Sequence, residues 1–449
     1  MKRILLPAGG AVLATGLLAT GLTGTSQAAA RVAHDPMARN SSAAVSIASF
    51  WLASNGAALR SATQYTWDSK EVRKVVSKGG YTPDGRPGTT APTGGTKAAG
   101  GQNVNLPKTV GKVFFVDAHG KFRWCSATSI QSNYRNLVAT AGHCVYDTDS
   151  NKDTLDKWVF VPGYYQGKAP WGIYVGKQAF THYDFDVYED YDRDYAFVTV
   201  YNGITLQRVK PVSKRDYQRF TGPKRSWGGR YHLLVVKDAG RLGDNVGGQG
   251  FAWNQPTGKP VRTFGYPAAP HPDGDRPYSG VTPKHCYGKT TGKKLGASWL
   301  KIEEHVGLKC AVTPGYDGGP WLLNYSNGKR TGYVNGVTST FADQDGNDRI
   351  DYITSPYFDG ETALGLQRGQ ERVVGQDRRP ERRAVQVSPT RGSEGLGLRG
   401  PRLVFTGPER PLAPSEDLRP ANGTEVFACR EPVGHMPGTR PEPPCGRAS

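Results

Sequence analysis

The stretch Thr313-Pro314-Gly315-Tyr316-Asp317-Gly318-Gly319-Pro320-Trp321-Leu322 decides how the rest of the chain is interpreted. Gly315 permits a sharp turn of the backbone, because glycine tolerates conformations that other residues avoid. The centre of the turn is Asp317, and the glycines after it allow a neighbouring chain to approach closely. The apolar residues after Pro320 predict a buried strand. By itself, a Gly-Gly-Pro sequence beside aromatic residues indicates only a turn, so its meaning depends on partners elsewhere in the chain.

A second motif, Thr140-Ala141-Gly142-His143-Cys144, directly follows the apolar run 137–140, which predicts a buried strand. Upstream of it, the segments 113–116 and 122–125 predict a hairpin that ends at Cys125. A lone histidine is more often structural or exposed than functional. The five-residue motif, the earlier cysteine and the downstream glycine turn together resemble the trypsin-like serine peptidases, most closely their secreted actinobacterial branch.

This resemblance implies roles for specific residues. It makes His143 the general base and implies a Cys125–Cys144 bridge, with a second bridge between Cys286 and Cys310. The family places an aspartate directly before a short apolar strand, and Asp194-Tyr195-Ala196-Phe197-Val198 fits that pattern. Such a carboxylate fixes the tautomer of the histidine and stabilises its charged form. Other acidic residues crowd this region, which is also compatible with an acidic surface loop. We expect those neighbours to be solvated: Asp184, Asp186, Glu189, Asp190 and Asp192.

The resemblance also assigns the substrate side of the site. The stretch Gly336-Val337-Thr338-Ser339 resembles the strand that lines the substrate cleft, and Ser339 would hydrogen-bond Asp194. The backbone donors of Gly315 and position 317 would form the oxyanion hole. The resemblance covers roughly residues 106–364 and predicts peptide-bond hydrolysis without a metal or other cofactor.

Asp317 departs from the family pattern because it stands where the serine nucleophile belongs. A carboxylate there raises the affinity of His143 for a proton and puts negative charge beside the oxyanion donors. Loss of the nucleophile from such a triad typically costs ~10⁶-fold in turnover, so we expect no peptidase activity.

Tyr316 is a second departure, because animal trypsins carry an aspartate there that receives the new N-terminus. Two other interpretations stay open: an active endopeptidase in which Asp317 is a sequence error or a tolerated change, and a non-catalytic protein that binds peptides or cell-wall polymer.

Many short β-branched and aromatic segments, abundant glycine and few helical patterns predict an all-β body. With the resemblance, the fold class is two six-stranded Greek-key barrels, one over about 106–205 and one over about 206–364. A short closing helix is expected over 355–366. Further predicted strands are 158–161, 173–175, 196–200, 233–236, 261–265, 299–302 and 333–338.

The N-terminal part of the chain predicts export. Residues 1–30 combine a basic start, an apolar run and a small-residue end, which is typical of a cleaved signal peptide. A membrane anchor is the alternative, and no later stretch looks long and apolar enough to span a bilayer. Residues 31–105 read as a pro-segment with a helix over 41–62 and a Gly/Pro-rich linker over 81–101, or as a disordered arm. We therefore expect a secreted, extracellular and monomeric protein that does not associate with membranes after signal removal.

The formal charge of +18 suits contact with acidic cell-wall polymers, and no recognition motif makes nucleic acid a specific partner. Residues 365–449 contain 14 Arg and no Lys, recurrent Pro and no apolar periodicity, which predicts a disordered, dispensable tail. A shifted reading frame is the alternative origin of this tail. It holds Cys429 and Cys445, whose state spacing does not determine. The acidic stretches 147–153 and 343–348 lack the glycine and glutamate of a calcium loop in place, so we read them as polar turns.

Overall fold

The computed structural model describes residues 32–66, 85–94, 106–148 and 154–371. The chain divides into two units, Met1–Glu381 and Arg382–Ser449, and every described residue belongs to the first. The predicted signal peptide, part of the predicted linker, most of the 147–153 loop, and Cys429 with Cys445 lie outside the described residues.

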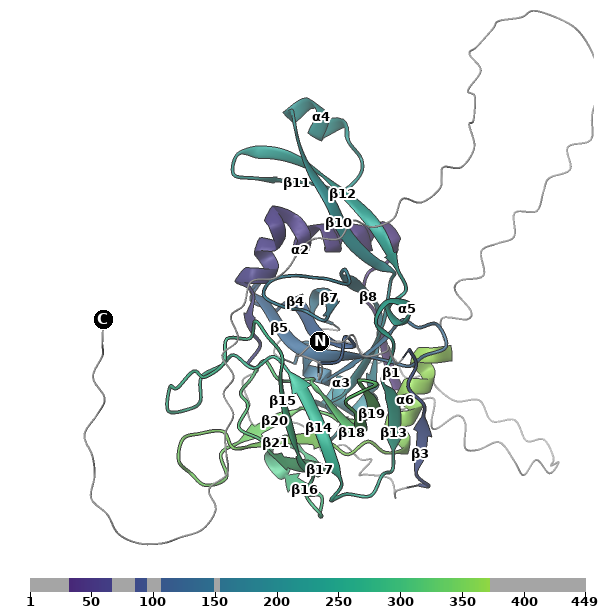
Figure 1. Ribbon diagram of the computed structural model, residues 1–449, viewed down its shortest axis with the longest axis vertical. Coiled ribbons are helices and arrows are strands. Elements are labelled where there is room, and N and C mark those ends of the chain that lie inside the picture. The colour runs from purple at the N-terminus through teal and green to yellow at the C-terminus, as the bar shows by residue number, and fades with distance from the viewer. Residues whose placement is uncertain (1–31, 67–84, 95–105, 149–153, 372–449) are drawn as a thin grey trace, which may run out of the picture. The chain divides into compact units, whose positions relative to one another are not determined.

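The first half of the body is a closed six-stranded barrel (Figure 1). Its strands follow one another as β4-β5-β6-β9-β8-β7, and antiparallel pairing of β7 with β4 completes the ring. Alternate side chains of β9 enter different clusters: Val198 packs inside the barrel, and Phe197 packs with residues of the second half. The strands are β4 Val110–Val116, β5 Phe122–Ile130, β6 Leu137–Thr140, β7 Asp156–Pro162, β8 Tyr174–His182 and β9 Ala196–Val200.

The second half consists of two sheets that form a half-barrel, where the sequence had predicted a second six-stranded barrel. One sheet runs β15-β14-β18-β19-β13-β3 and the other β16-β17-β21-β20. Their apolar faces share a core that includes Val306, Trp321 and Ile353. The strands are β13 Gly250–Trp253, β14 Pro260–Gly265, β15 Lys284–Lys289, β16 Leu295–Ala297, β17 Ile302–Lys309, β18 Pro320–Ser326, β19 Thr331–Val337, β20 Thr340–Ala342 and β21 Tyr352–Pro356. The all-β, two-barrel expectation is thus confirmed, with the second barrel open.

Residues ahead of the first barrel are built into the body. β1 (Val32–Pro36) pairs with β8, β2 (Thr63–Gln64) pairs with β5, and β3 (Gly88–Thr90) pairs with β13. The described part of the predicted linker is therefore an ordered sheet edge rather than a flexible connection. The assignment of residues 31–105 as a removable pro-segment stays a prediction.

Helix α2 (Ser41–Ser61) confirms the predicted helix, and it bends at residues 53–56, whose backbone is not helical. The Asn40 side chain accepts a hydrogen bond from the Ala43 N–H at 2.9 Å and caps the helix start. In the part of the chain that the structure describes, α2 meets the length and composition of a membrane span, so the expectation that no stretch after the signal peptide does so was wrong. It is nevertheless part of the protein core, because the Trp51 ring is fully buried and contacts Phe114 of the barrel.

Between the two halves the chain forms a three-stranded arm, a feature that the sequence had indicated only at 233–236. β10 (Gly203–Val212), β12 (Arg230–Gly240) and β11 (Lys224–Trp227) pair in that order, and α4 (Lys214–Arg219) packs on β12. In Figure 1 these elements lie together beyond α2. Residues 203–240 carry nine Lys and Arg against two Asp, a net charge of +7. Two other short helices are α3 (Tyr183–Tyr188) and α5 (Leu242–Val246).

Three local expectations need correction. Ser298–Leu300 is a 3₁₀ turn, and the predicted strand 299–302 begins only at Ile302. The closing helix is α6 (Gly360–Glu371), because residues 352–356 belong to β21. It extends the ordered body beyond the predicted tail boundary, and Leu366 is buried.

The 343–348 loop is a polar turn, as expected. The Asp343 carboxylate accepts hydrogen bonds from the N–H groups of Gly346, Asn347 and Asp348. These contacts direct its oxygens into the turn itself.

Candidate active site

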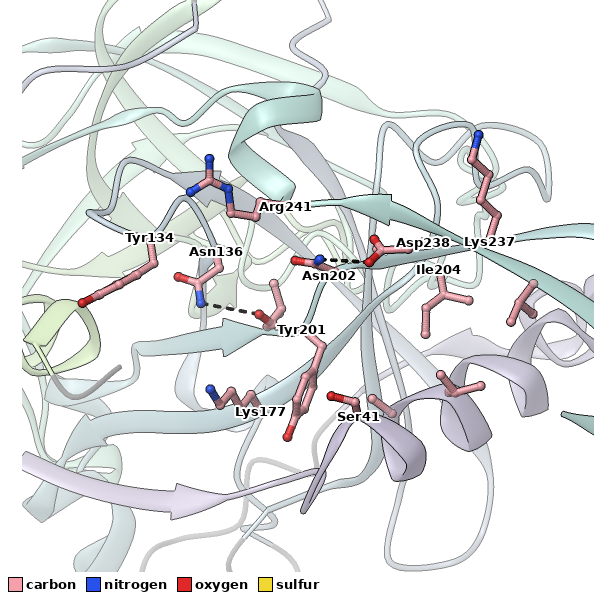
Figure 2. Close-up of a pocket in the computed structure, with 15 residues that line it drawn as sticks. Ser41, Tyr134, Asn136, Lys177, Tyr201, Asn202, Ile204, Lys237, Asp238 and Arg241 are labelled. Carbon is pink, nitrogen blue, oxygen red and sulfur yellow. Dashed lines mark hydrogen bonds between the residues drawn. The ribbon is translucent and has the colours of Figure 1, made fainter. Parts of the chain in front are cut away.

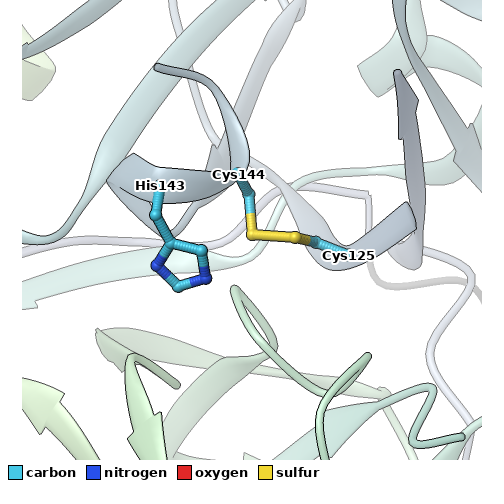
Figure 3. A group of neighbouring side chains, drawn as sticks. All are labelled: Cys125, His143 and Cys144. Atoms are coloured by element: carbon cyan, nitrogen blue, oxygen red, sulfur yellow. A yellow bond between two sulfur atoms is a disulfide. The ribbon is translucent and has the colours of Figure 1, made fainter. Parts of the chain in front are cut away.

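The histidine of the candidate site is positioned by the end of β6. The chain leaves Thr140 and turns sharply through a 3₁₀ turn, Gly142–Cys144. A side chain at Gly142 would lie 2.5 Å from the ring of Phe185, so this turn needs glycine. The predicted Cys125–Cys144 bridge is present and ties the turn to β5 (Figure 3). Although the three polar atoms of Cys125, His143 and Cys144 lie close together, the two sulfurs bond each other and offer no metal site.

Asp194 lies directly before β9 and contacts the histidine twice. Its Oδ2 is 2.8 Å from His143 Nδ1, and its Oδ1 accepts the His143 backbone N–H at 2.9 Å. Ser339 donates from Oγ to the same Oδ2 at 2.5 Å. Burial by itself raises the pKa of Asp194, but the contacts with His143 and Ser339 outweigh burial and hold it below its usual range. The structure thus brings together three residues that are far apart in sequence.

The acidic neighbours of Asp194 are not all solvated as expected. Asp190 and Asp192 are buried. The Asp192 carboxylate pairs with Arg193 and accepts the backbone N–H groups of Glu303 and Glu304 on β17. The Asp190 carboxylate accepts the Asp192 N–H. The Asp192 carboxylate therefore holds the loop before β9 against the second half of the body, whereas the Asp190 carboxylate stabilises the loop itself.

Asp317 sits on a turn that only glycines permit. Gly315 and Gly318 have φ angles of +98° and +74°. A side chain at Gly318 would lie 2.0 Å from Thr140 Oγ1, and one at Gly315 would lie 2.6 Å from the Tyr266 carbonyl. The Ser126 N–H donates to the Asp317 carbonyl at 2.7 Å, which fixes the turn to β5.

The Asp317 carboxylate spans the centre of the site and is 1% exposed. One oxygen, Oδ1, lies 3.4 Å from His143 Nε2. The other, Oδ2, accepts the backbone N–H of Gly315 at 2.7 Å. The carboxylate therefore contacts both the imidazole and one of the two backbone donors expected to form the oxyanion hole.

The two carboxylates control the charge of the imidazole. Burial by itself lowers the pKa of His143, but Asp194 and Asp317, on opposite nitrogens, outweigh it and raise the pKa to about 9. At neutral pH the ring is consequently a buried imidazolium between two acidic groups. In this state it cannot accept a proton from a nucleophile.

A cavity of about 470 Å³ opens beside Asp317. Its wall is mainly apolar, with Trp299 and Phe341 as its largest side chains and Gln344 as a polar member. His305 of β17 reaches this wall, but its two nitrogens lie 2.8 Å from Thr354 Oγ1 and from the Tyr191 carbonyl. Burial lowers the pKa of His305. Sequence reasoning missed this histidine because nothing around it in β17 marks it as a site residue.

A larger cavity of about 560 Å³ lies between α2 and the base of the arm (Figure 2). Asn202 donates to Asp238 at 3.1 Å on one side of it. This larger cavity shares no lining residue with the cavity beside Asp317. Its lining places no nucleophile next to a base. We therefore assign the candidate site to the smaller cavity.

The remaining predicted residues are also located. The Cys286–Cys310 bridge is present as predicted. The Tyr316 side chain is buried away from the cleft, with its hydroxyl 2.8 Å from Thr263 Oγ1. It fills the interior position next to Asp317 as a packing residue.

No protein-family model and no curated protein matches this chain. Among solved structures, the protease Anisep from Arthrobacter nicotinovorans is similar at 24% identity over 59% of this chain and 97% of its own, with a TM-score of 0.43. The thermostable serine protease AL20 from an extremophilic microorganism has the same identity and TM-score over 61% and 100%. A Glu endopeptidase is 15% identical over 61% and 95%, with a TM-score of 0.38. At these sequence identities and TM-scores, the function has to be argued from the side chains of this chain.

Proposed function

We propose that this chain, which has the fold of the trypsin-like serine proteases, is a secreted homologue in which Asp317 suppresses peptide-bond hydrolysis. The carrying observation is that the Asp317 carboxylate lies between His143 Nε2 and the Gly315 N–H. In the serine-peptidase reaction, a hydroxyl gives its proton to a neutral imidazole while its oxygen attacks the carbonyl carbon. Position 317 has no hydroxyl to make that attack.

The other parts of the machinery are affected as well. His143, with its pKa raised to about 9, is protonated at neutral pH and does not serve as the base. The Gly315 N–H donates to Asp317 instead of a developing oxyanion. His143, Asp194 and Ser339 nevertheless keep the hydrogen-bonded arrangement that a triad requires. We therefore propose that the site is one substitution away from activity.

The test is Asp317→Ser, assayed for peptide hydrolysis and for labelling by a serine-directed fluorophosphonate. We expect the fluorophosphonate to label Asp317→Ser and not the unaltered protein. In the hydrolysis assay, loss of the nucleophile from such a triad lowers turnover by a factor on the order of 10⁶. Asp317→Asn is the matched control, because it removes the charge without adding a nucleophile. Asp317→Ser combined with His143→Ala should lose the labelling again.

Two outcomes would contradict the proposal. Cleavage by the unaltered protein would mean that Asp317 does not block the reaction. If Asp317→Ser folds but neither hydrolyses the peptide nor reacts with the fluorophosphonate, restoring one hydroxyl is not enough for activity.

Peptide binding without cleavage is a second candidate function. The mainly apolar cavity beside Asp317 favours it, because such cavities with a few polar groups are typical of ligand sites. Export is supported by the two disulfides, since such bonds persist in oxidising compartments. N-terminal sequencing of the protein from the culture medium would test export, with a start near Ala30 if the pro-segment is retained and a later start if it is removed.

A further inference from the structure

A short segment ahead of the first barrel crosses the candidate site. β2 (Thr63–Gln64) lies parallel to the start of β5, with Thr63 opposite Arg123 and Gln64 opposite Trp124. The Tyr65 N–H donates to the Trp124 carbonyl at 2.8 Å. Arg123 Nη1 adds a hydrogen bond to Thr63 Oγ1 at 2.8 Å. The segment is thus held as an added strand, the way a sheet edge binds an extended peptide.

The Tyr65 ring fills a slot next to the imidazole. Its centroid is 6.2 Å from that of His143, with the planes 28° apart, so the two rings stack. On another side it meets Phe115 edge-on, with centroids 5.2 Å apart. Tyr65 is only 3% exposed, and His143 is 0% exposed. An imidazolium beside the face of an aromatic ring is also an attractive pair, and the raised pKa of His143 favours that charge.

The residues on both sides of Tyr65 contact other parts of the site. Gln64 lies over the Gly315 turn, since a side chain built on Gly315 would approach Gln64 Cβ at 3.1 Å. Thr66 lines the same cavity as Asp317. The four residues therefore run from the edge of β5 across the imidazole to the cavity.

We propose that the edge of β5, the His143 ring and the Gly315 turn form a docking surface for an extended peptide with an aromatic side chain, and that Thr63–Thr66 is its resident occupant. A substrate or ligand peptide has to displace this segment to reach His143. The inference deepens the proposed function, since it concerns the same cleft. Its test does not require hydrolysis, so the two proposals fail separately.

The experiment measures access to position 317 in the full-length protein. Asp317→Cys introduces a thiol, and its reaction with fluorescein maleimide is followed by peptide mass spectrometry of the segment that contains position 317. We expect the additional substitution Tyr65→Ala to accelerate labelling at least ten-fold, and Tyr65→Phe to leave it slow because the stacked ring is kept. Tyr183→Ala is the matched control, because Tyr183 is 41% exposed on α3 and should not change the rate.

The aromatic slot is tested in the same system. Millimolar p-cresol should restore slow labelling in Asp317→Cys with Tyr65→Ala, whereas cyclohexanol at equal concentration should not. If Tyr65→Ala fails to fold by circular dichroism, Thr63→Val removes the Arg123 hydrogen bond and should give a smaller, several-fold acceleration. Equal labelling with and without the Tyr65 ring would overturn the occlusion, and accelerated labelling that p-cresol does not slow would overturn the aromatic slot.

Discussion

Replacing Asp317 with asparagine should lower the proton affinity of His143 and leave the shape of the site unchanged. The Asp317 carboxylate and the imidazole are 3.4 Å apart and almost completely buried, so the interaction is poorly screened. Two carboxylates together raise the pKa of His143 from 6.5 to about 9. At 1.36 kcal/mol per pH unit, this corresponds to about 3 kcal/mol in favour of the imidazolium. Asp317→Asn leaves Asp194 alone, and we expect the pKa to fall by about one to two pH units.

The same shift predicts how stability depends on pH. The folded pKa of His143 lies above the unfolded value, so its stabilisation is complete below about pH 6.5 and is lost as the pH rises through about 9. The free energy of unfolding should therefore decrease between pH 7 and pH 10. In that range Asp317→Asn should lose less stability than the unaltered protein.

Nuclear magnetic resonance of histidine-labelled protein measures this pKa directly. The chain has nine histidines, so His143→Gln identifies the relevant signal. Asp184→Asn is the matched control, because Asp184 pairs with His182 and should leave the His143 titration unchanged. Titration of His143 near its ordinary value in the unaltered protein would refute the reasoning, and so would an identical pKa in Asp317→Asn.

Three further results are expected. Removing the Cys125–Cys144 bridge by double serine substitution should lower the urea-derived free energy of unfolding by about 3 kcal/mol, because the bridge closes a loop between residues 19 apart. An unchanged free energy would show that the bridge does not constrain this loop. Truncation after Glu371 should keep the melting temperature, whereas truncation after Asp359 removes α6 with its buried Leu366 and should lower it by several degrees or more. Charge reversal of Lys214 and Arg215 on the arm should make the protein leave a heparin column at lower salt, and unchanged elution would place the polyanion contact elsewhere.

Sequence alone determined the parts of this protein that depend on local pattern. Short apolar runs such as Ala196–Val200 predicted buried strands, because β-branched and aromatic residues over so few positions are typical of a strand that is covered on both faces. The resemblance carried by the two motifs around His143 and Asp317 implied both disulfides and the residues that meet at the site, whereas cysteine spacing by itself left the pairing open. Glycine at positions 315 and 318 marked the turn, because its positive φ angles exclude other residues there.

Tertiary structure decided the hydrogen bonding, protonation and burial of the site residues, which no local sequence pattern shows. The occupation of the Gly315 N–H by Asp317 depends on the path of the turn, and the protonation of His143 depends on burial between two carboxylates. Asp192 looked like a surface acid, but hydrogen bonds from β17 compensate its burial. Tyr65 lies 78 positions before His143 in the chain and contacts it because β2 pairs with β5. That pairing forms only in the folded barrel. Backbone pairing and desolvation act between residues far apart in the chain, so these features follow from the folded arrangement and not from spacing.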